Sequence, residues 1–584
     1  MRMISSRLVV VVKGKAMRLA ICLWLALLGL PGLVLNEFRV EAWAAQDLAQ
    51  LSLEELMMVE VSTVGKRSQT LSETPAAIYV LTQEEIRRSG ATSIPEALRR
   101  VPGLNVAQLN SNQWAISARG FNGLFANKVL VLIDGRNVYS PLFAGVNWDV
   151  QDMLLEDVER IEVIRGPGAT LWGANATNGV INIITKRAED TQGGLLTGGF
   201  GSVEKGFGGV RYGGQIGQEA FYRFYAKYFN RDGLTRLDGR KGADDWDSLR
   251  GGFRMDWSGP GGNSLTMQGD IYHADTGVTQ TFAAISPPFQ STVDNRRELN
   301  GGHLLGRWQH NYSPTSTTQL QFYYDRAERK EILLEEVRDT FDLDFQHQFS
   351  WGARHNIVWG AGYRYTKDDL QNSFVLTFSP NERGDHLFSG FAEDEIELVS
   401  NWLSLILGFK LEENDSTGFE IQPSARLAWT PSIRQTGWAS VTRAVRTPNR
   451  FIEDVRIRLA VIPNPQGPLT ILSILGSRDV KSDNILAYEL GYRYQPTPDV
   501  SLDVATFYNL YSDLLSTEPA SPFFESSPPP PHLVVPLRFD NQLEGETYGL
   551  EAIVAWQAAS RWKLRASYSW LDIQLHRQPT SVDA

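Results

Sequence analysis

The sequence LSLILGFKL at residues 403–411 decides the fold, because large apolar side chains occupy every odd position. The even positions hold Ser, Gly and Lys together with one Ile. Successive side chains of a β-strand point to opposite faces of its sheet, so this pattern predicts a strand with one apolar face. Segments 222–228, 488–494 and 564–570 alternate in the same way. We therefore expect a series of amphipathic β-strands from about residue 193 onward.

Three further features distinguish this series from the sheets of soluble proteins. The alternating segments run for roughly 10 to 16 residues, whereas soluble strands usually have about 5 or 6. Tyr and Trp gather near the segment ends, as in the aromatic girdles of membrane barrels. Short connections at 429–432 and 495–499 alternate with long ones at 450–481 and 515–538. We predict a membrane β-barrel with its apolar face toward lipid, and a soluble β-sandwich is the alternative.

The composition narrows the class of protein without identifying it. The chain has 584 residues, a formal net charge of -11 and a single cysteine. The negative charge argues against a general nucleic-acid binder, which normally carries a basic excess. One cysteine excludes a disulfide scaffold.

The first 45 residues have the features of a secretory signal peptide in the usual order. Basic residues precede the apolar stretch 19–35, and the small-residue sequence AWAA follows at 42–45. This order predicts export and removal of residues 1–45, with an uncleaved anchor helix as the alternative. The single cysteine, Cys22, lies inside this segment, so we expect none in the mature chain.

Residues 71–190 have a different pattern, typical of a small mixed α/β domain. Thr82 and Glu85 have the spacing of a helix capping box. The apolar run at 129–133, followed by Asp-Gly, predicts a buried strand that enters a hairpin turn. Segments 158–164 and 180–185 predict two more strands. A compact domain ahead of a wide barrel suggests a plug that fills the barrel lumen.

One region of this domain carries a recognisable motif. The sequence VERIEVIRGP at 158–167 continues through LWGANA at 171–176 to GVINIITK at 179–186. It resembles the plug signature of the TonB-dependent receptors of the Gram-negative outer membrane, with Trp172 where that family usually has Tyr. RVPGL at 100–104, ARGF at 118–121 and VLIDG at 131–135 resemble further plug motifs in the same order. The signature positions are Arg160, Glu162, Arg165, Gly166, Pro167, Gly173, Gly179 and Asn182.

The chemistry of the signature residues can also be interpreted without the resemblance. A phosphate-binding loop is not expected, because the glycines up to Gly173 are not followed by Lys and Ser/Thr. Arg160, Glu162, Arg165 and Lys186 are expected to pair with lumen-facing charges of the barrel wall, with solvated strand charges as the alternative.

The resemblance implies an energy-transducing partner, the TonB protein of the inner membrane. VEVSTV sits where the family carries its TonB box, within an expected periplasmic tether at residues 46–70. An extended, β-branched segment suits addition as a strand to the edge of a partner's sheet. A plug strand or a disordered tether is the alternative. The residues of the predicted TonB box are Val59, Glu60, Val61, Ser62, Thr63 and Val64.

By the same resemblance, the ligand site lies where plug loops meet the long extracellular loops. Aromatic residues with one Arg suit a bulky anionic or chelated ligand, and packing within the plug is the alternative at most of these positions. The candidate ligand-binding positions are Trp114, Arg119, Phe121, Asn127, Tyr139, Phe143 and Trp148.

The resemblance implies TonB-dependent active uptake of a scarce ligand across the outer membrane, and we expect a ferric siderophore. Cobalamin is the main alternative, and haem is a weaker one because no His lies between residues 450 and 487. We expect a monomer in contact with outer-membrane lipid, with no nucleic-acid partner and no cofactor.

Two other classes stay open, a passive porin-like or adhesive barrel and an enzymatic barrel. The sequence has no H-E-x-x-H or G-x-S-x-G motif, and its His, Asp and Glu spacings give no credible metal site. We therefore expect that the protein is not an enzyme.

The strand count is lower than the resemblance implies. The alternating segments number about 17, whereas barrels of the resembled family have about 22 antiparallel strands. The last clear strand, 564–573, is followed by a polar tail. An open edge at membrane depth leaves backbone groups unpaired in lipid. We therefore expect residues 191–584 to form an incomplete transmembrane β-barrel whose sequence lacks roughly five C-terminal strands.

Overall fold

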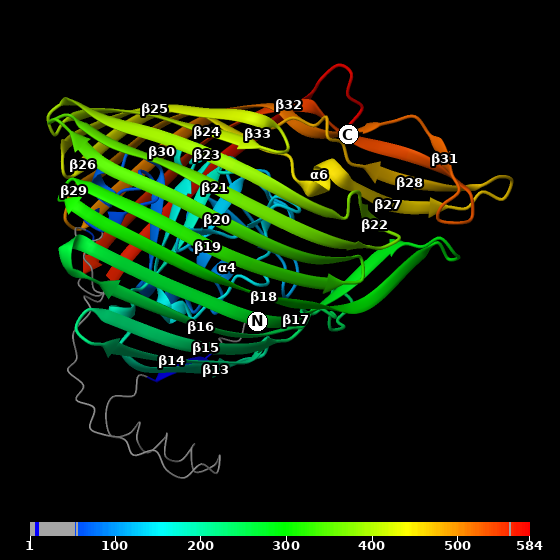
Figure 1. The fold of residues 1–584 in the computed structure, drawn as a ribbon, viewed down its shortest axis with the longest axis horizontal. Helices are drawn as coiled ribbons and strands as arrows, with labels where there is room; N and C mark the ends of the chain where they lie inside the picture. The colour runs from blue at the N-terminus through cyan, green and yellow to red at the C-terminus, as the bar shows by residue number, and fades with distance from the viewer. Residues whose placement is uncertain (1–5, 11–52, 54–56, 560–561, 584) are drawn as a thin grey trace, which may run out of the picture.

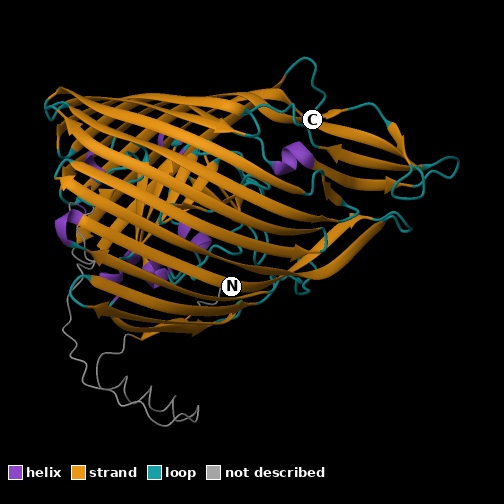
Figure 2. Ribbon diagram, in the orientation of Figure 1, coloured by secondary structure: helices purple, strands orange, loops and turns teal. Residues whose placement is uncertain are grey.

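The computed structural model describes residues 6–10, 53, 57–559 and 562–583. Most of the chain forms a β-barrel of long, tilted strands around a smaller α/β domain (Figure 1). Helices are few and short, and they lie mainly inside this barrel (Figure 2). The predicted signal peptide lies outside the described residues except for β1 (Ser6–Val10), whose backbone pairs antiparallel with β13.

The described residues contain one 22-stranded sheet. Five of its strands are not part of the wall: β1, β22 (Leu376–Phe378), β27 (Val455–Ile462), β28 (Leu469–Leu475) and β31 (Phe523–Glu525). The other seventeen form the wall, in agreement with the sequence count. The wall strands are β13 (Gly193–Phe200), β14 (Glu204–Ile216), β15 (Ala220–Arg231), β16 (Trp246–Ser258), β17 (Asn263–Ala283), β18 (Gln290–Ser313), β19 (Ser316–Glu331), β20 (Leu334–Trp351), β21 (His355–Asn372), β23 (Glu382–Val399), β24 (Leu403–Asn414), β25 (Gly418–Ser432), β26 (Gln435–Arg446), β29 (Asp483–Thr497), β30 (Val500–Pro519), β32 (His532–Ala559) and β33 (Trp562–Arg577).

The alternation in β24 sets which side chains face outward. Leu407 and Phe409 are 43% and 44% exposed on the outer face, whereas Lys410 is 5% exposed and points inward. An apolar exterior and a charged interior are the arrangement of a membrane barrel. The predicted barrel with an α/β domain in its lumen is confirmed.

The last wall strand has one neighbour. β33 pairs antiparallel with β32, and no further strand pairs with it among the described residues. The expectation that the sequence stops before the barrel closes stays a prediction.

The domain inside the barrel, which we call the plug, is built on a five-stranded sheet in the order β4-β11-β12-β7-β8. β7 lies parallel to β12, and the other pairs are antiparallel. Three predicted features are confirmed: the capping box of Thr82 with Glu85, the two strands of the signature, and the turn after β7. The sheet strands are β4 (Ile78–Thr82), β7 (Val129–Ile133), β8 (Arg136–Asn137), β11 (Val158–Arg165) and β12 (Gly179–Thr185). The remaining plug elements are β2 (Glu60–Val61), β3 (Gln69–Thr70), α3 (Gln83–Ser89), α4 (Ile94–Leu98), β5 (Leu104–Gln108), β6 (Trp114–Ala118), β9 (Tyr139–Ser140), β10 (Gly145–Val146) and α5 (Ala169–Trp172).

Both faces of the plug sheet are buried, which explains its continuous apolar strands. On one face, Val131 and Ile161 pack against Ile86 of α3 and Ile94 of α4. On the other face, Leu130 and Leu132 pack with residues of the segment 57–71. This segment is therefore part of the plug core.

Two connections predicted as long loops contain further strands. Residues 450–481 include α6 (Arg450–Asp454), β27 and β28, and residues 515–538 include β31 and one end of β32. β28 pairs with β27 and runs parallel to β32. Together with β22 and β31 they form a small sheet that projects beyond the wall (Figure 1). We call this end of the barrel the cap end.

Candidate functional site

The predicted TonB-box residues 59–64 lie against the plug. β2 pairs antiparallel with β3. Val61 and Thr63 are 0% exposed, and Val64 is 6% exposed. The described part of the expected tether is therefore packed as a plug strand, which was the alternative to a free segment. The apolar side chains of this segment pack in the plug core with Leu130 and Leu132. Burial of that apolar surface holds the segment in place.

Three plug side chains hold Thr63, and we call them the clamp. The Glu162 carboxylate accepts the backbone amide of Thr63 at 3.0 Å and also that of Ser62 at 3.1 Å. Trp172 Nε1 donates to the Thr63 carbonyl at 2.8 Å. Asn182 Nδ2 donates to the Thr63 hydroxyl at 3.0 Å. Glu162, Trp172 and Asn182 all come from the signature region, so this motif positions the predicted TonB box.

The charged signature residues divide into two groups. Arg160 Nε donates to Glu162 at 2.8 Å, so these two pair within the plug and not with the wall as predicted. Arg165 does pair with the wall, since its guanidinium is 3.2 Å from Glu551 of β32. The first pair orients the clamp, and the second attaches the plug to the barrel.

Two signature glycines allow the plug to approach the wall closely. Gly166 and Gly173 have φ values of 127° and 86°, which residues with a Cβ rarely adopt. A side chain at Gly166 would collide with Glu489, and one at Gly173 would collide with Glu412. Two other signature residues, Pro167 and Gly179, are buried at the link between β11 and β12.

Two predicted ligand-binding residues lie in the plug core instead. Trp114 and Trp148 are 3% and 6% exposed and belong to the core that contains α3 and α4. The β5–β6 hairpin turns the Trp114 ring inward, where it stacks with the Arg99 guanidinium at 5.2 Å. Both tryptophans pack within the plug core, which was the alternative interpretation of these positions.

Two further predicted positions attach the plug to the wall. Arg119 is 3% exposed, and its guanidinium donates to Glu489 of β29 at 2.6 Å. The Phe121 ring is 5.0 Å from the ring of Tyr511 of β30. Arg119 is therefore buried at the wall, and Phe121 is half-buried against it.

The remaining three predicted positions are half-buried: Asn127 and Phe143 in plug loops, and Tyr139 in β9. The Phe143 ring is 5.4 Å from that of Phe125, which stacks at 6.4 Å on Phe451 of α6. Phe125 is 58% exposed. Phe125 and Phe451 are not among the positions predicted from the sequence. The signal was present in FNGLFAN at 121–127, where large apolar residues interrupt a Gly/Asn-rich turn.

A cavity of about 440 Å³ separates part of the plug from the wall between β16 and β24. Ser62 and Lys66 line it beside the clamp, and Asn449 and Arg450 line it at the cap end. Its lining is rich in charged groups, which suits water and an oxygen-rich polar ligand. Other charged lining residues are Asp134, Arg136, Arg160, Arg250, Asp270, Arg307, Asp325, Glu328, Arg329, Glu336, Arg338, Asp342, Asp344, Arg364, Arg383, Asp385, Lys410, Glu412 and Asp415.

Tyr139 also lines this cavity. Its hydroxyl is buried and has no hydrogen-bond partner among the described residues. Burial raises the pKa of Tyr139 above its ordinary value, so the hydroxyl is a neutral donor. A buried, unsatisfied hydroxyl is uncommon in proteins and is available to a ligand oxygen.

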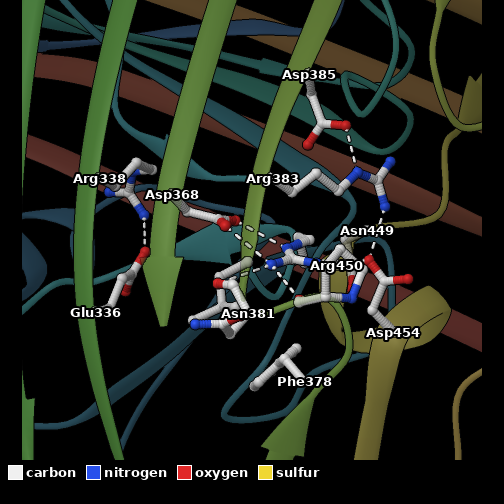
Figure 3. A network of polar contacts seen from close by, with 12 residues as sticks. Glu336, Arg338, Asp368, Phe378, Asn381, Arg383, Asp385, Asn449, Arg450 and Asp454 are labelled. Atoms are coloured by element: carbon white, nitrogen blue, oxygen red, sulfur yellow. Dashed lines mark hydrogen bonds and ion pairs between the residues drawn. The ribbon is translucent and has the colours of Figure 1, made fainter. Parts of the chain in front are cut away.

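An ionic network at the cap end fixes α6 over the cavity. Figure 3 shows the Arg450 guanidinium between Asp368 of β21 and Asp454. Arg450 binds both Asp368 oxygens at 2.9 Å and Asp454 at 2.6 Å. Arg383 also donates to Asp454, at 2.9 Å. The backbone amide of Phe451 donates to the Leu142 carbonyl of the plug at 2.8 Å, so α6 connects the cap to the plug.

Charge pairs between plug and wall are arranged by sign. Plug carboxylates face bases on β14–β16 and β19, and plug bases face carboxylates on β20, β23 and β29–β32. Arg136 with Asp325 and Glu85 with Arg565 of β33 depart from this pattern. Segregation of the wall charges by sign gives the plug one favoured rotation in the lumen. The acidic-side pairs are Asp134–Arg254, Asp149–Arg329, Asp152–Lys227 and Asp157–Arg223. The basic-side pairs are Lys66–Asp344, Arg67–Glu395, Arg119–Glu489, Lys128–Asp483 and Arg165–Glu551.

Within the described ranges, no group of three or more His, Cys, Asp and Glu side chains is placed to hold a metal ion. Likewise, none of the described helices has the length and apolar character needed to cross a membrane.

Two family models match almost the whole length of this architecture. The TonB-dependent Receptor Plug Domain matches residues 70–180, and the TonB dependent receptor-like, beta-barrel matches residues 190–583. This chain belongs to the TonB-dependent receptor family. The family is one of transport receptors, and its barrels are proteins of the Gram-negative outer membrane. The predicted family and fold are confirmed.

Relatives of this receptor differ in the share of the chain that they match. It is 23% identical over 535 residues to the iron-regulated outer membrane virulence protein of Vibrio cholerae, and this match covers 87% of this chain and 77% of that protein. It is 37% identical over 144 residues to the vitamin B12 transporter BtuB of Vibrio vulnificus, which covers 24% of this chain and 23% of that protein. The crystal structure of the siderophore receptor PirA from Acinetobacter baumannii matches with a TM-score of 0.67 and 17% identity, over 86% of this chain and 81% of PirA. This last likeness supports the fold alone.

Proposed function

We propose that this receptor takes up a ferric siderophore across the outer membrane, with energy supplied by TonB. The observation that carries the proposal is the cavity, which runs from Asn449 and Arg450 at the cap end to Ser62 and Lys66 beside the clamp. A ligand that enters at the cap end is thereby able to influence the predicted TonB box. We take the cap end to face the outside and the protein to act as a monomer surrounded by lipid.

The proposed cycle begins at the cap end of the plug. The ligand binds against the exposed Phe125 ring and the half-buried Asn127, Tyr139 and Phe143. Occupancy loosens the clamp, and residues 59–64 leave the plug for the periplasm. Their extended, β-branched sequence then adds as a strand to TonB. The inner-membrane complex, driven by the proton gradient, pulls on the plug and opens a passage.

The ligand class rests on the chemistry of the cap end and on the relatives. Exposed aromatic rings beside a charged cavity suit a bulky, oxygen-rich chelate. The match named for iron regulation extends over 87% of this chain, whereas the match named for cobalamin extends over 24%. A ferric siderophore is therefore proposed first and cobalamin second. Haem is a third candidate, for which residues 450–487 supply no His.

Growth tests separate these ligands. A strain that lacks the gene, complemented with the wild-type gene, is grown on a panel of ferric chelates, cobalamin and haem as sole sources. Growth on ferric chelates alone is expected. The same strain complemented with a gene that lacks codons 59–64 should bind the chelate and fail to grow. Growth with that deletion would show that the TonB box lies elsewhere or that uptake is passive.

A passive barrel is the competing class of function. Its measurement is the conductance of the purified protein in a planar bilayer. The proposed receptor should show no stable open channel while the plug is in place. A constant conductance with the plug docked would favour the porin-like class.

A further inference from the structure

Lys66 lies where the cavity meets the clamp. Its ammonium is 5.0 Å from the centre of the Trp172 ring and 4.4 Å from the Phe391 ring. The same ammonium is 3.6 Å from the Asp344 carboxylate of β20. Lys410 of β24 places a second ammonium 5.7 Å from the Phe391 ring. Two cations therefore flank one aromatic ring on the wall of a polar cavity, beside the carboxylates of Asp344 and Glu412. An anion that displaces a carboxylate there has two ammonium groups to bind.

Trp172 connects this place to the predicted TonB box. The face of its ring contacts the Lys66 ammonium, and its indole N–H donates to the Thr63 carbonyl at 2.8 Å. Trp172 also lines the cavity. One side chain therefore contacts the cation, the cavity and the held segment.

The backbone of Lys66 is held in an unfavourable conformation. Its φ is 48°, in the left-handed region that residues with a Cβ avoid. Its carbonyl accepts a hydrogen bond from Gln346 of β20 at 2.6 Å, and the Asp344 pair holds its side chain. When the side-chain contacts are lost, the backbone is free to relax toward an ordinary φ. Thr63 lies three residues earlier, so this relaxation moves the residue that the clamp holds.

We propose that Lys66 and Lys410 form an inner binding site for an anionic, oxygen-rich group of the ligand, and that its occupation opens the clamp. The anion competes with Asp344 for the Lys66 ammonium and draws it away from the Trp172 ring. The left-handed backbone at Lys66 relaxes, and Thr63 loses the indole hydrogen bond. The inference rests on the proposed function in taking residues 59–64 as the segment that TonB binds.

The test measures release of the segment directly. Ser62 lines the cavity beside the clamp and is partly buried. It is replaced in the full chain by Ser62→Cys, in a background where the single cysteine of the sequence is removed by Cys22→Ser. The rate of alkylation by a water-soluble maleimide reports how often the segment leaves the plug. The probe anion is citrate, compared with chloride at equal ionic strength.

Three results are expected. Trp172→Phe keeps a ring beside Lys66 but removes the N–H donor, and it should accelerate labelling by a factor of about 2 to 10, the effect of one hydrogen bond. Citrate should accelerate labelling of the unsubstituted clamp by a comparable factor relative to chloride. Lys66→Met should abolish the citrate effect, and Lys66→Arg should retain it because the charge stays.

Trp114→Phe is the matched control. Trp114 is a buried plug tryptophan whose Nε1 has no hydrogen-bond partner among the described residues. Its replacement removes the same atoms without removing a hydrogen bond, so labelling at position 62 should not change. Equal acceleration by both tryptophan variants would overturn the role of the Trp172 N–H. A citrate effect that is absent, or that persists undiminished in Lys66→Met, would overturn the anion site.

Circular dichroism of each variant confirms that the barrel is folded before labelling is compared. Failure of this inference is distinguishable from failure of the proposed function. If the anion site is wrong but the function is right, deletion of residues 59–64 still abolishes uptake. If uptake survives that deletion, either the TonB box lies elsewhere or uptake is passive, whatever the labelling shows.

Discussion

The Glu162 carboxylate accepts the backbone amide of Thr63 at 3.0 Å across a sequence separation of 99 residues. The same carboxylate receives a hydrogen bond from Arg160 at its other oxygen. Glu162→Gln offers one acceptor oxygen where the carboxylate offers two, so a buried donor loses its partner. The expected cost is about 1–3 kcal/mol in the stability of the docked segment. Hydrogen exchange of the Ser62 and Thr63 amides should accelerate accordingly.

Glu189→Gln is the control for this variant. Glu189 is partly exposed and pairs with Arg187 at 2.9 Å, an ion pair of a kind that contributes little. Exchange at residues 62 and 63 should be unchanged. Equal protection in Glu162→Gln and in the unsubstituted receptor would show that apolar packing alone holds the segment.

Local sequence patterns predicted much of this fold. The alternation in β24 gave the inward position of Lys410 and the outward positions of Leu407 and Phe409. The capping box at Thr82 and the Asp-Gly turn after β7 depend on neighbouring residues only. Such features can be predicted from sequence because each depends on residues within a few positions along the chain.

The site was less predictable because long-range packing decides it. The residues near Trp114 in the sequence do not indicate that its hairpin turns the ring into the core that contains α3 and α4. Residues 59–64 have the composition of a free strand, and their burial depends on Glu162, which lies about a hundred positions away. The sequence predicts 450–481 as one long connection, whereas β27 and β28 form within it and pair with β22 and β32, which are distant in the sequence. Phe125 is not among the predicted ligand positions, although a large apolar residue in the Gly/Asn-rich stretch 121–127 was the usable signal.

The ion pair between Asp149 and Arg329 is expected to make plug docking sensitive to acid. The two Asp149 oxygens bind the guanidinium of β19 at 2.9 and 3.0 Å. Burial alone would raise the pKa of Asp149, but the charges of Arg329 and Arg297, together with hydrogen bonds to the carboxylate, hold that pKa below its ordinary value. Because the unfolded value is about 3.9, the stabilisation is full above about pH 5 and is lost as the pH falls through the folded pKa.

Asp149→Asn tests this dependence by leaving Arg329 buried without its carboxylate. The expected loss is about 3–5 kcal/mol of plug stability at pH 7. The measurement is the urea midpoint of plug unfolding, followed by tryptophan fluorescence at several pH values. The difference between the unsubstituted receptor and the variant should shrink below about pH 4. Asp294→Asn, at an exposed ion pair with Arg236, should leave the midpoint unchanged at every pH.

Tyr139→Phe is expected to separate ligand binding from stability. The Tyr139 hydroxyl is buried without a partner among the described residues, so its removal should leave the melting temperature unchanged or slightly higher. If this hydroxyl donates to the ligand, affinity should fall by a factor of about 2 to 10. Titration with the chelate that supports growth measures the affinity. A marked fall in melting temperature would show that the hydroxyl has a partner in the resting receptor.

Arg450→Lys is expected to loosen α6 at the cap end. The bidentate contact with Asp368 needs the planar guanidinium, which Lys does not provide. The expected cost is about 1–3 kcal/mol in local stability, seen as faster hydrogen exchange at Phe451, whose amide bonds to the plug. Arg478→Lys is the matched control, because Arg478 is 62% exposed although it binds the same Asp454. Equal acceleration by both variants would mean that the network acts through its net charge and not through the Arg450 geometry.

Phe125→Ala is expected to weaken ligand binding without destabilising the receptor. The ring is 58% exposed and lies 5.4 Å from Phe143 and 6.4 Å from Phe451. Because so much of it already contacts solvent, truncation removes little buried surface in the resting state. A ligand that covers the ring would lose about 1–2 kcal/mol of binding free energy, or about 5- to 30-fold in Kd. Phe524→Ala is the matched control, because Phe524 is 71% exposed on β31 of the cap sheet. Equal affinity for the chelate in both variants would place the ligand away from the plug loop that carries Phe125, on the strands of the cap sheet or deeper in the cavity.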